Sequence, residues 1–235
     1  MNATAPVTRF QLAEIAALLA DPSRAGVLLA LLDGSTRPAT ELALLVGIAP
    51  ATASVHLRKL VDGGLLAVLE QGRHRYYRLA DDEVAHLLEA LAFARSSPRQ
   101  TARIAQADPA LALARSCYRH LAGRLGVALF ERLNAHGGLV LDVDSVRLHR
   151  AGFDLLHDAG LIEAGNDVTR LRGRACLDWT ERRFHLAGPL GCHLLQRLLD
   201  LRWLRHGNDA RTLALGKHGR AGLRALGIDW HRLAA

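Results

Sequence analysis

The amino-acid sequence, 235 residues long, predicts a mainly α-helical protein with small β-hairpins, an α+β fold in two parts. Two observations support this prediction. Residues 39–79 have the pattern of a short helix, a tight turn, a second helix and a basic hairpin. Further on, a short motif occurs twice at an offset of 65 residues, beginning at His120 and again at His185. We therefore expect an N-terminal part over residues 1–97 and a C-terminal part over residues 98–235.

The first helix of this run is predicted over residues 41–46, and Gly47 can end it because glycine tolerates the left-handed backbone of a helix stop. Pro50 suits the first turn of a helix, which places the second helix over residues 51–62. Its apolar stripe follows the helical spacing i, i+4, i+7. The stripe consists of Ala53, Leu57 and Leu60.

With that stripe buried, the other face of the second helix carries small polar, methyl-bearing and cationic side chains. These candidate DNA-binding residues are Thr52, Ser54, Val55, His56, Arg58 and Lys59. Hydroxyl groups can hydrogen-bond base edges, a valine can contact a thymine methyl group, and cations can bind the phosphates that flank the major groove. The pattern therefore predicts a helix that reads the major groove of DNA.

A β-hairpin is predicted next, because two strand-like segments, residues 65–70 and 73–79, flank Gln71 and Gly72. Cations crowd its tip and add three candidate DNA-binding residues, Arg73, His74 and Arg75. A basic loop in isolation is often only solvated. Beside a groove-reading helix, we expect this hairpin to bind phosphates or the minor groove.

Together with an apolar helix near the N-terminus, these segments resemble the ArsR-type winged helix-turn-helix regulators. The matching segments are residues 12–24, 49–60, 64–66 and 72–79. The resemblance covers about residues 8–95 and implies a homodimeric repressor. It also implies an imperfect palindromic operator in double-stranded DNA, an effector that changes the grip on DNA, and dimer helices over residues 11–19 and 82–94.

The sequence departs from the metal-sensing members of that family. Where they carry a Cys-x-Cys pair, this chain has Ala43, Leu44 and Leu45. On the last predicted helix of the N-terminal part, His86 and Glu89 form a single pair whose partner ligands are not at matching positions. We therefore assign no metal ligands and expect no cofactor.

Composition indicates a globular protein, because half of the residues are apolar. The sequence lacks a signal-type segment and any stretch near the ~18 apolar residues of a membrane span, so we expect a cytoplasmic protein without a membrane partner. Three cysteines in such a chain are expected to be reduced thiols. The net charge of +7 arises outside the N-terminal part: residues 1–95 hold 9 basic and 10 acidic residues of the 30 and 23 in the chain.

In the C-terminal part, residues 120–126 recur as residues 185–191. We predict two helix-hairpin-helix repeats, about residues 110–162 and 175–228, with a pocket or an oligomer interface at the seam between them. The predicted hairpin strands are residues 139–142, 145–148, 201–204 and 211–215. Four glycines of the motif are interpreted as positions of close helix packing: Gly123, Gly126, Gly188 and Gly191.

Chemically reactive and charged side chains gather around this motif. The effector-sensing candidates are Cys117, His120, Cys176, Trp179, Arg182, Arg183 and His185. Thiols and imidazoles could sense a soft metal or a reactive species, and a planar acidic small molecule could stack on the tryptophan and pair with the arginines. The alternative is a buried ion network. The spacing of Cys117 and His120 is compatible with one face of a helix.

The sequence has none of the nucleotide-binding glycine loops, phosphate loops or nucleophile elbows of common enzyme classes, and we assign no catalytic residues. The predicted function is sequence-specific regulation of transcription, modulated through the C-terminal part. The alternatives are a thiol- or metal-responsive regulator that uses the C-terminal cysteines and histidines, an enzyme fused to a winged helix with Cys117 and His120 or Cys176 and His185 as its reactive pair, and a protein-binding module.

Overall fold

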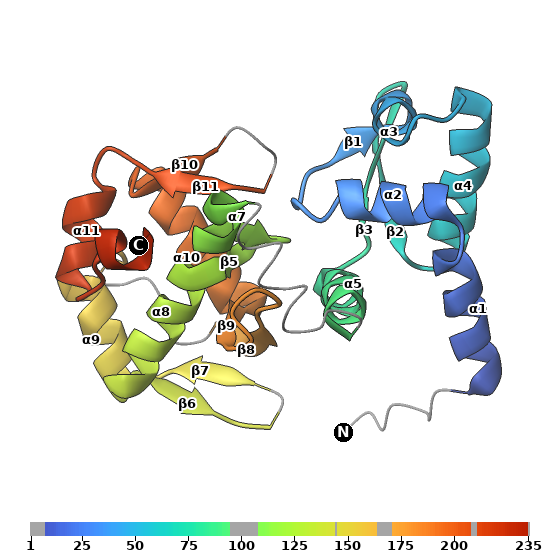
Figure 1. Cartoon of the computed structure of the whole chain (residues 1–235). Coiled ribbons are helices and arrows are strands. Elements are labelled where there is room, and N and C mark those ends of the chain that lie inside the picture. Colours follow the sequence, from blue (N-terminus) through green and yellow to red (C-terminus); the bar gives the residue numbers. More distant parts are fainter. Residues whose placement is uncertain (1–7, 95–107, 144, 164–170, 208–210, 235) are drawn as a thin grey trace. The chain divides into compact units, whose positions relative to one another are not determined.

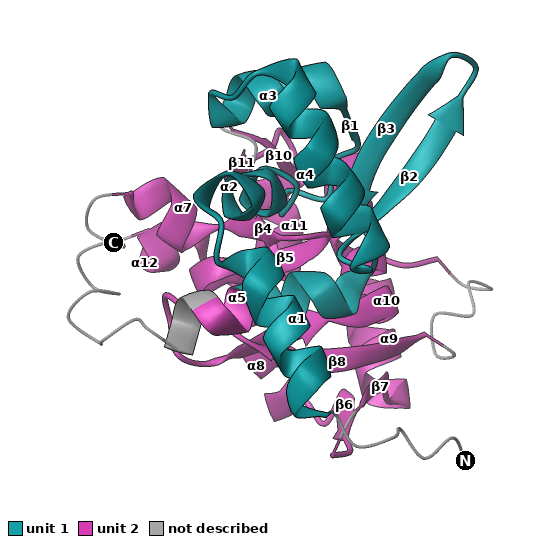
Figure 2. Cartoon of the chain, turned by 90° about the vertical axis from the view of Figure 1, so that its right-hand side faces the viewer, with its two compact units in different colours: residues 1–88 teal, residues 89–235 magenta. Residues whose placement is uncertain are grey.

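The computed structural model of this chain describes residues 8–94, 108–143, 145–163, 171–207 and 211–234. It divides into two compact units, residues 1–88 and 89–235, which Figure 2 colours teal and magenta. The boundary predicted between residues 97 and 98 lies outside the described residues. Among the described residues, no single helix is long and apolar enough to cross a membrane, and only α3 and α4 taken together, bent by 107°, meet the length and composition criteria.

The first unit contains four helices and the start of a fifth (Figure 1). They are α1 (Arg9–Leu19), α2 (Pro22–Ala30), α3 (Ala39–Val46), α4 (Pro50–Asp62) and α5 (Asp82–Ala94). Gly47 ends α3 with φ of 71°, as the sequence predicts. The helix α1 begins two residues before the predicted start, because Thr8 caps it through a reciprocal hydrogen-bond pair with Gln11.

Three strands complete the first unit, in the order β1 (Arg37–Pro38), β3 (His74–Leu79) and β2 (Leu66–Gln71). Figure 2 shows β2 and β3 as a long hairpin that projects from the helices of this unit. The predicted hairpin is confirmed, and Gly72 turns it with φ of 61°. The sequence analysis missed β1, because a two-residue strand that ends in proline carries no alternation pattern.

The core of the first unit lies under α4. Ala53, Leu57 and Leu60 are all buried, which confirms the predicted stripe. The same core includes Val27 and Leu28 of α2 and further residues from α3 and β3, Leu42 and Leu79. Because this stripe is buried, the opposite face of α4 is turned away from the core.

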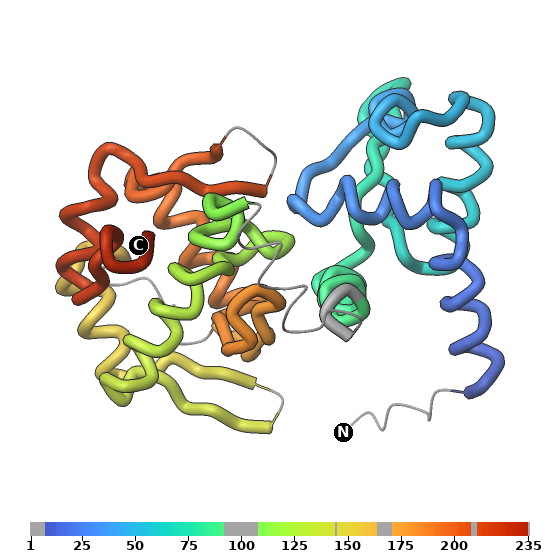
Figure 3. Tube along the Cα trace, in the orientation of Figure 1, coloured from blue at the N-terminus to red at the C-terminus, as the bar shows by residue number. Residues whose placement is uncertain are grey.

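The second unit can be followed from green α8 to red α11 in Figure 3. Its first half contains α7 (Pro109–Leu113), β4 (Arg115–Cys117), β5 (His120–Ala122), α8 (Gly123–Ala135), β6 (Leu139–Leu141), β7 (Val146–Leu148) and α9 (Arg150–Asp158). Its second half contains β8 (Arg172–Leu177), β9 (Phe184–Ala187), α10 (Gly188–Asp200), β10 (Leu204–His206), β11 (Leu213–Leu215), α11 (Gly219–Ala225) and α12 (Trp230–Ala234).

This unit therefore carries more strands than the predicted helix-hairpin-helix repeats. The hairpins β4–β5 and β8–β9, which precede the two long helices, were not predicted. The strands β4 and β5 have three residues each and are joined by two residues, too few to show an alternation of apolar and polar side chains. These hairpins occupy the segments that the sequence pattern predicted as the starts of helices.

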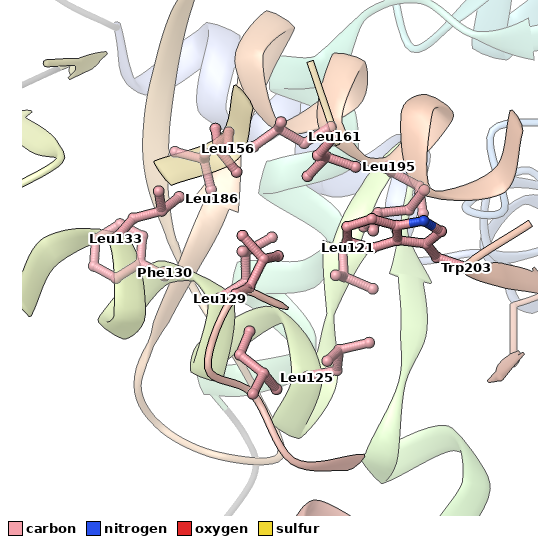
Figure 4. Close-up of a cluster of buried hydrophobic side chains, with 14 of the residues drawn as sticks. Leu121, Leu125, Leu129, Phe130, Leu133, Leu156, Leu161, Leu186, Leu195 and Trp203 are labelled. Atoms are coloured by element: carbon pink, nitrogen blue, oxygen red, sulfur yellow. The ribbon is translucent and has the colours of Figure 1, made fainter. Parts of the chain in front are cut away.

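Strand pairing joins the two halves of the second unit. In the four-stranded sheet β6-β7-β8-β9, β7 of the first half pairs with β8 of the second half. A second connection between the halves is an antiparallel bridge that links Arg115 of β4 to Thr212, next to β11. The core is also shared: Figure 4 shows Leu125 and Leu129 of α8 in the same cluster as Leu195 and Trp203 of the second half.

The glycines of the repeated motif have a different role from the predicted one. Gly123 and Gly188 start α8 and α10 with φ of 77° and 71°. A Cβ atom on Gly126 would lie 2.5 Å from the carbonyl oxygen of Leu121, in the strand just before the helix. The motif thus permits a tight turn from strand into helix, rather than close packing of two helices.

Candidate functional site

The outer face of α4 is a continuous polar surface. Thr52, Ser54, Arg58 and Lys59 are exposed, and Val55 is 54% exposed in their midst. The hydroxyl of Ser54 donates to the carbonyl oxygen of Pro50 at 2.9 Å, which leaves the lone pairs of its oxygen to accept a hydrogen bond from a base amino group.

His56 is the one helix candidate that turns away from this surface. Its side chain is half-buried, and its Nδ1 atom is buried without a hydrogen-bond partner among the described residues. It lies near Asp21, at the start of α2, whose pKa is lowered chiefly by the backbone N–H of Arg24 and also by the charge of His56. His56 therefore belongs to the side of α4 that packs against the other elements of the first unit.

The tip of the hairpin presents Arg73, His74 and Arg75, all exposed. The guanidinium of Arg75 pairs with Glu70 on the opposite strand at 2.9 Å, an exposed ion pair of the kind that exchanges readily with other partners. A groove of about 680 Å³ lies between α4 and the hairpin. Its lining includes Ser54, Arg58, Arg73, His74 and Arg75, so the helix and hairpin candidates share one concave surface.

Four of the seven effector-sensing candidates meet inside the second unit, in a group that we call the Cys–His cluster: Cys117, His120, Cys176 and His185. One donor atom from each residue lies within 4.8 Å of the donors of the other three, and all four residues are buried. The two Nε2 atoms are 3.1 Å apart, and the imidazole rings are stacked with centroids separated by 5.1 Å. Two thiols and two imidazoles at these distances could hold a metal ion, although no metal ligands were predicted from the sequence.

Two hairpins position these side chains. Cys117 is directly opposite His120 in β4–β5, and Cys176 is directly opposite His185 in β8–β9. Directly opposed residues of antiparallel strands place their side chains on the same face of the hairpin. Cys117 and His120 therefore come together across a hairpin turn, in which Tyr118 has φ of 57°, and not along a helix face.

A buried carboxylate supports the cluster. Asp178 Oδ2 lies 3.2 Å from His185 Nδ1 and accepts a hydrogen bond from the backbone N–H of Gly123 at 2.7 Å. Its Oδ1 atom pairs with Arg115 Nη2 at 2.9 Å, and both side chains of this pair are fully buried. Burial alone would raise the pKa of Asp178, but the hydrogen bond from His185 and the charge of Arg115 hold it well below its ordinary value.

The ionisable groups of the cluster are also perturbed. Burial lowers the pKa of His185, but hydrogen bonds with Asp178 and Cys117 outweigh burial and raise it to about 9. The hydrogen bond with Cys176 and then burial raise the pKa of Cys117 to about 12. A buried thiol with a raised pKa is a poor nucleophile, so the arrangement does not favour Cys117 and His120 as a reactive pair.

The other three effector-sensing candidates do not join the Cys–His cluster. The guanidinium of Arg115 covers one face of the Trp179 ring, with its central carbon 4.6 Å from the ring centroid. Arg183 pairs with Glu131, and Arg182 occupies the turn between β8 and β9 with φ of 56°. The buried pair of Arg115 with Asp178 fits the predicted alternative of an internal ion network, whereas the pair of Arg183 with Glu131 is exposed.

A second hollow, of about 590 Å³, lies elsewhere in the second unit. It is lined by Phe130, Leu141, Val143, Val146, Arg174 and Phe184, among others. None of the seven effector-sensing candidates contributes to its described lining. The apolar part of this lining is accompanied by polar side chains of both charges, Asp142 and Arg174, so the hollow has the chemistry of a site for an amphipathic small molecule.

Of the two residues that support the cluster, Asp178 was noted as a charged residue near the motif but not chosen as a sensing candidate, and Arg115 was not noted. Arg115 directly follows an apolar segment, residues 110–114, and it is fully buried. A buried arginine requires a buried partner, but the identity of that partner depends on a contact 63 residues away along the chain.

Comparison with known proteins gives matches over most of the chain and over its N-terminal part. A helix-turn-helix domain model matches residues 19–68. The chain is 38% identical over 218 residues to YdfF of Bacillus subtilis, named an uncharacterized HTH-type transcriptional regulator, covering 89% of this chain and 93% of that protein. It is 40% identical over 80 residues to the HTH-type transcriptional regulator CmtR of Mycobacterium tuberculosis, covering 34% of this chain and 67% of CmtR.

Among solved structures, a homodimeric winged helix-turn-helix DNA-binding domain from Mycobacterium bovis, described as a possible ArsR-family transcriptional regulator, is 28% identical to this chain. The match covers 39% of this chain and 89% of that domain, with a TM-score of 0.35.

Proposed function

This chain belongs to the HTH-type transcriptional regulators, and from that premise we propose that it is a homodimeric repressor of the ArsR winged-helix type. In this proposal α4 and the β2–β3 wing bind a palindromic operator, and the second unit modulates the binding. The observation that carries the proposal is the outer face of α4, where Thr52, Val55 and Arg58 are exposed beside a groove that the basic wing completes.

The helix α1 supports the homodimer. It buries none of its residues, although its sequence is largely apolar. Phe10 is 67% exposed and Leu12 is 63% exposed. A second copy of the chain would remove this apolar surface from water, and two copies related by a twofold axis would present two α4 helices to the two halves of a palindrome.

The course of α5 supports modulation by the second unit. This helix passes residue 88 and ends within the second unit, where Glu89 pairs with Arg211. Arg211 Nε donates to the carbonyl oxygen of Ser116 at 3.2 Å, next to Cys117. A change in the conformation of the Cys–His cluster would therefore act on a residue of a predicted dimer helix. A small molecule in the hollow near Phe184 is the alternative effector.

Substitutions on α4 are expected to separate phosphate binding from base recognition. Arg58→Ala and Lys59→Ala should weaken binding to operator and to random DNA alike, and each phosphate that is no longer neutralised should reduce the slope of log K against log salt by about 0.9. Thr52→Ala and Ser54→Ala should cost mainly sequence preference, about 1–3 kcal/mol for each base that the variant no longer recognises.

The measurement is fluorescence anisotropy with a duplex selected from random sequence, titrated at several salt concentrations. Footprinting of the same duplex should reveal two half-sites centred about 10 bp, or a multiple of this, apart. Arg150→Ala, on an exposed ion pair of the second unit, is the matched control and should leave both affinity and slope unchanged. Unchanged binding and slope in all four α4 variants would reject the assignment of this face to DNA.

A further inference from the structure

We propose that Cys117, His120, Cys176 and His185 form a closed tetrahedral site for a divalent cation that prefers thiolate and imidazole ligands, for which Zn²⁺ is the best chemical match. The site would join the hairpins β4–β5 and β8–β9 of the second unit. It is separate from the DNA-binding face, and its existence does not depend on the proposed function.

The donor set and its spacing support this proposal. Two sulfur and two nitrogen donors form a common structural zinc set, and bond lengths of about 2.0 Å for Zn–N and 2.3 Å for Zn–S place the ligand atoms of a tetrahedron about 3.3–3.8 Å apart. The donors of the Cys–His cluster lie within 4.8 Å of one another, and the two Nε2 atoms are 3.1 Å apart. Small side-chain movements suffice to place all four around one ion.

A buried carboxylate lies beside the second ring nitrogen of one of the two imidazoles. The charge of Asp178, whose Oδ2 atom lies 3.2 Å from Nδ1 of His185, favours a proton on Nδ1, and a neutral ring protonated there keeps its Nε2 lone pair for a metal. A carboxylate in this position commonly orients a histidine that binds zinc. Without an ion, two Nε2 atoms face each other and only one of them can donate a hydrogen bond. A cation between them would be bound by both lone pairs.

Charge and burial agree with the same interpretation. A dication with two thiolates has no net charge, so the site can lie in an apolar interior without an uncompensated ion. The four residues are between 1% and 7% exposed, which leaves no open coordination position for solvent. A closed site of this kind stabilises a fold or reports on metal supply, rather than activating a water molecule.

The fold builds the site symmetrically from both halves of the second unit. Each hairpin contributes one cysteine and one histidine. The glycine of each long helix leaves room for the histidine of the other half: a Cβ on Gly126 would lie 3.4 Å from Cβ of His185, and a Cβ on Gly191 would lie 3.2 Å from Cβ of His120. A bound metal would therefore cross-link segments that are distant in the sequence.

The test uses the untagged full chain, and the probes are Zn²⁺ and Co²⁺. We expect one tightly bound Zn²⁺ per chain by elemental analysis. Co²⁺ substitution should give the intense ligand-field bands of tetrahedral cobalt and a charge-transfer band with the intensity of two thiolates. Cys117→Ser and Cys176→Ser should each weaken metal binding by about 100-fold or more. Cys192→Ser, at a half-buried cysteine of α10 outside the Cys–His cluster, is the matched control and should retain full binding.

A second readout does not require the variants to fold. With metal bound to the wild-type chain, a thiol reagent should modify Cys192 alone, and a strong chelator should make all three cysteines reactive. The proposal would be overturned if the wild-type chain bound no metal tightly or gave no tetrahedral cobalt bands. It would also be overturned if stoichiometric metal binding survived in Cys117→Ser and Cys176→Ser, or if metal binding were lost in Cys192→Ser. Because no DNA is used, these outcomes leave the proposed DNA-binding function to its own test.

Discussion

Replacing Arg115 with methionine is expected to lower the free energy of unfolding of the second unit by about 3–5 kcal/mol. Arg115 and Asp178 form an ion pair in which both side chains are fully buried. Methionine replaces the aliphatic part of the arginine side chain but carries no charge, so the variant leaves a buried carboxylate without the guanidinium that pairs with it. Removal of one partner from a buried pair is far more costly than loss of the interaction itself, because the remaining charge cannot reach water.

Urea unfolding followed by tryptophan fluorescence measures this effect. All three tryptophans of the chain, Trp179, Trp203 and Trp230, lie in the second unit and report on that unit alone. The matched control is Arg150→Met, which removes one partner of a pair whose side chains are 81% and 50% exposed. That control should change stability by less than about 0.5 kcal/mol. If Arg115→Met were within the same range, the ion pair would not be a support of this unit.

The second large effect is expected from Gly191→Ala. In an ordinary helix this change stabilises the protein, because alanine is the better helix former by about 1 kcal/mol. Here the added Cβ would lie 2.3 Å from the carbonyl oxygen of Leu186 and 3.2 Å from Cβ of His120. Either α10 must move away from β9 or His120 must shift. We therefore expect a loss of about 2–3 kcal/mol of unfolding free energy, together with weaker binding of Co²⁺ at the Cys–His cluster.

Gly137→Ala is the control for this variant. Gly137 has φ of 67° and nothing lies within 4 Å of the Cβ that alanine would add. Only the backbone cost of about 1–2 kcal/mol applies there, and Co²⁺ binding should stay as in the wild type. Equal cobalt affinity in the two variants would show that Gly191 does not position His120.

The first unit was largely predictable because its signals are local. The spacing of Ala53, Leu57 and Leu60 fixes the buried side of α4, and Gly47 and Gly72 mark turns that need a left-handed backbone. Each of these features depends on residues within one or two helical turns. His56 was predicted on or beside the outer face, and its side chain is half-buried. The boundary between the faces of a helix is set by the elements that pack on it and not by spacing alone.

The Cys–His cluster was less accessible to sequence reasoning. The repeated motif correctly drew attention to His120 and His185, which occupy the same position in both copies. The two histidines are separated by the 65-residue offset of the motif, but the two cysteines are not, because the loop between β8 and β9 is longer than the loop between β4 and β5. Cys117 and His120 pair across two strands of only three residues each. Over so short a segment a helix and a hairpin have the same sequence pattern, so the sequence alone did not distinguish them.

For Trp179, Arg182 and Arg183 the sequence left two alternatives open, a ligand-binding surface and an internal ion network. Aromatic and cationic side chains near a motif are equally suited to a ligand and to each other. Arg115 covers one face of Trp179, and Glu131 pairs with Arg183. Only the tertiary contacts distinguish these two cases.

The central claim, that the outer face of α4 contacts DNA, is tested most directly by site-specific photo-crosslinking. A photo-reactive amino acid at Val55, which is 54% exposed, is expected to form an adduct with a base of the selected operator. The same amino acid at Val143, which is fully exposed in the second unit, should form none. Efficient adducts from position 143 together with none from position 55 would contradict the assignment of α4 as the recognition helix.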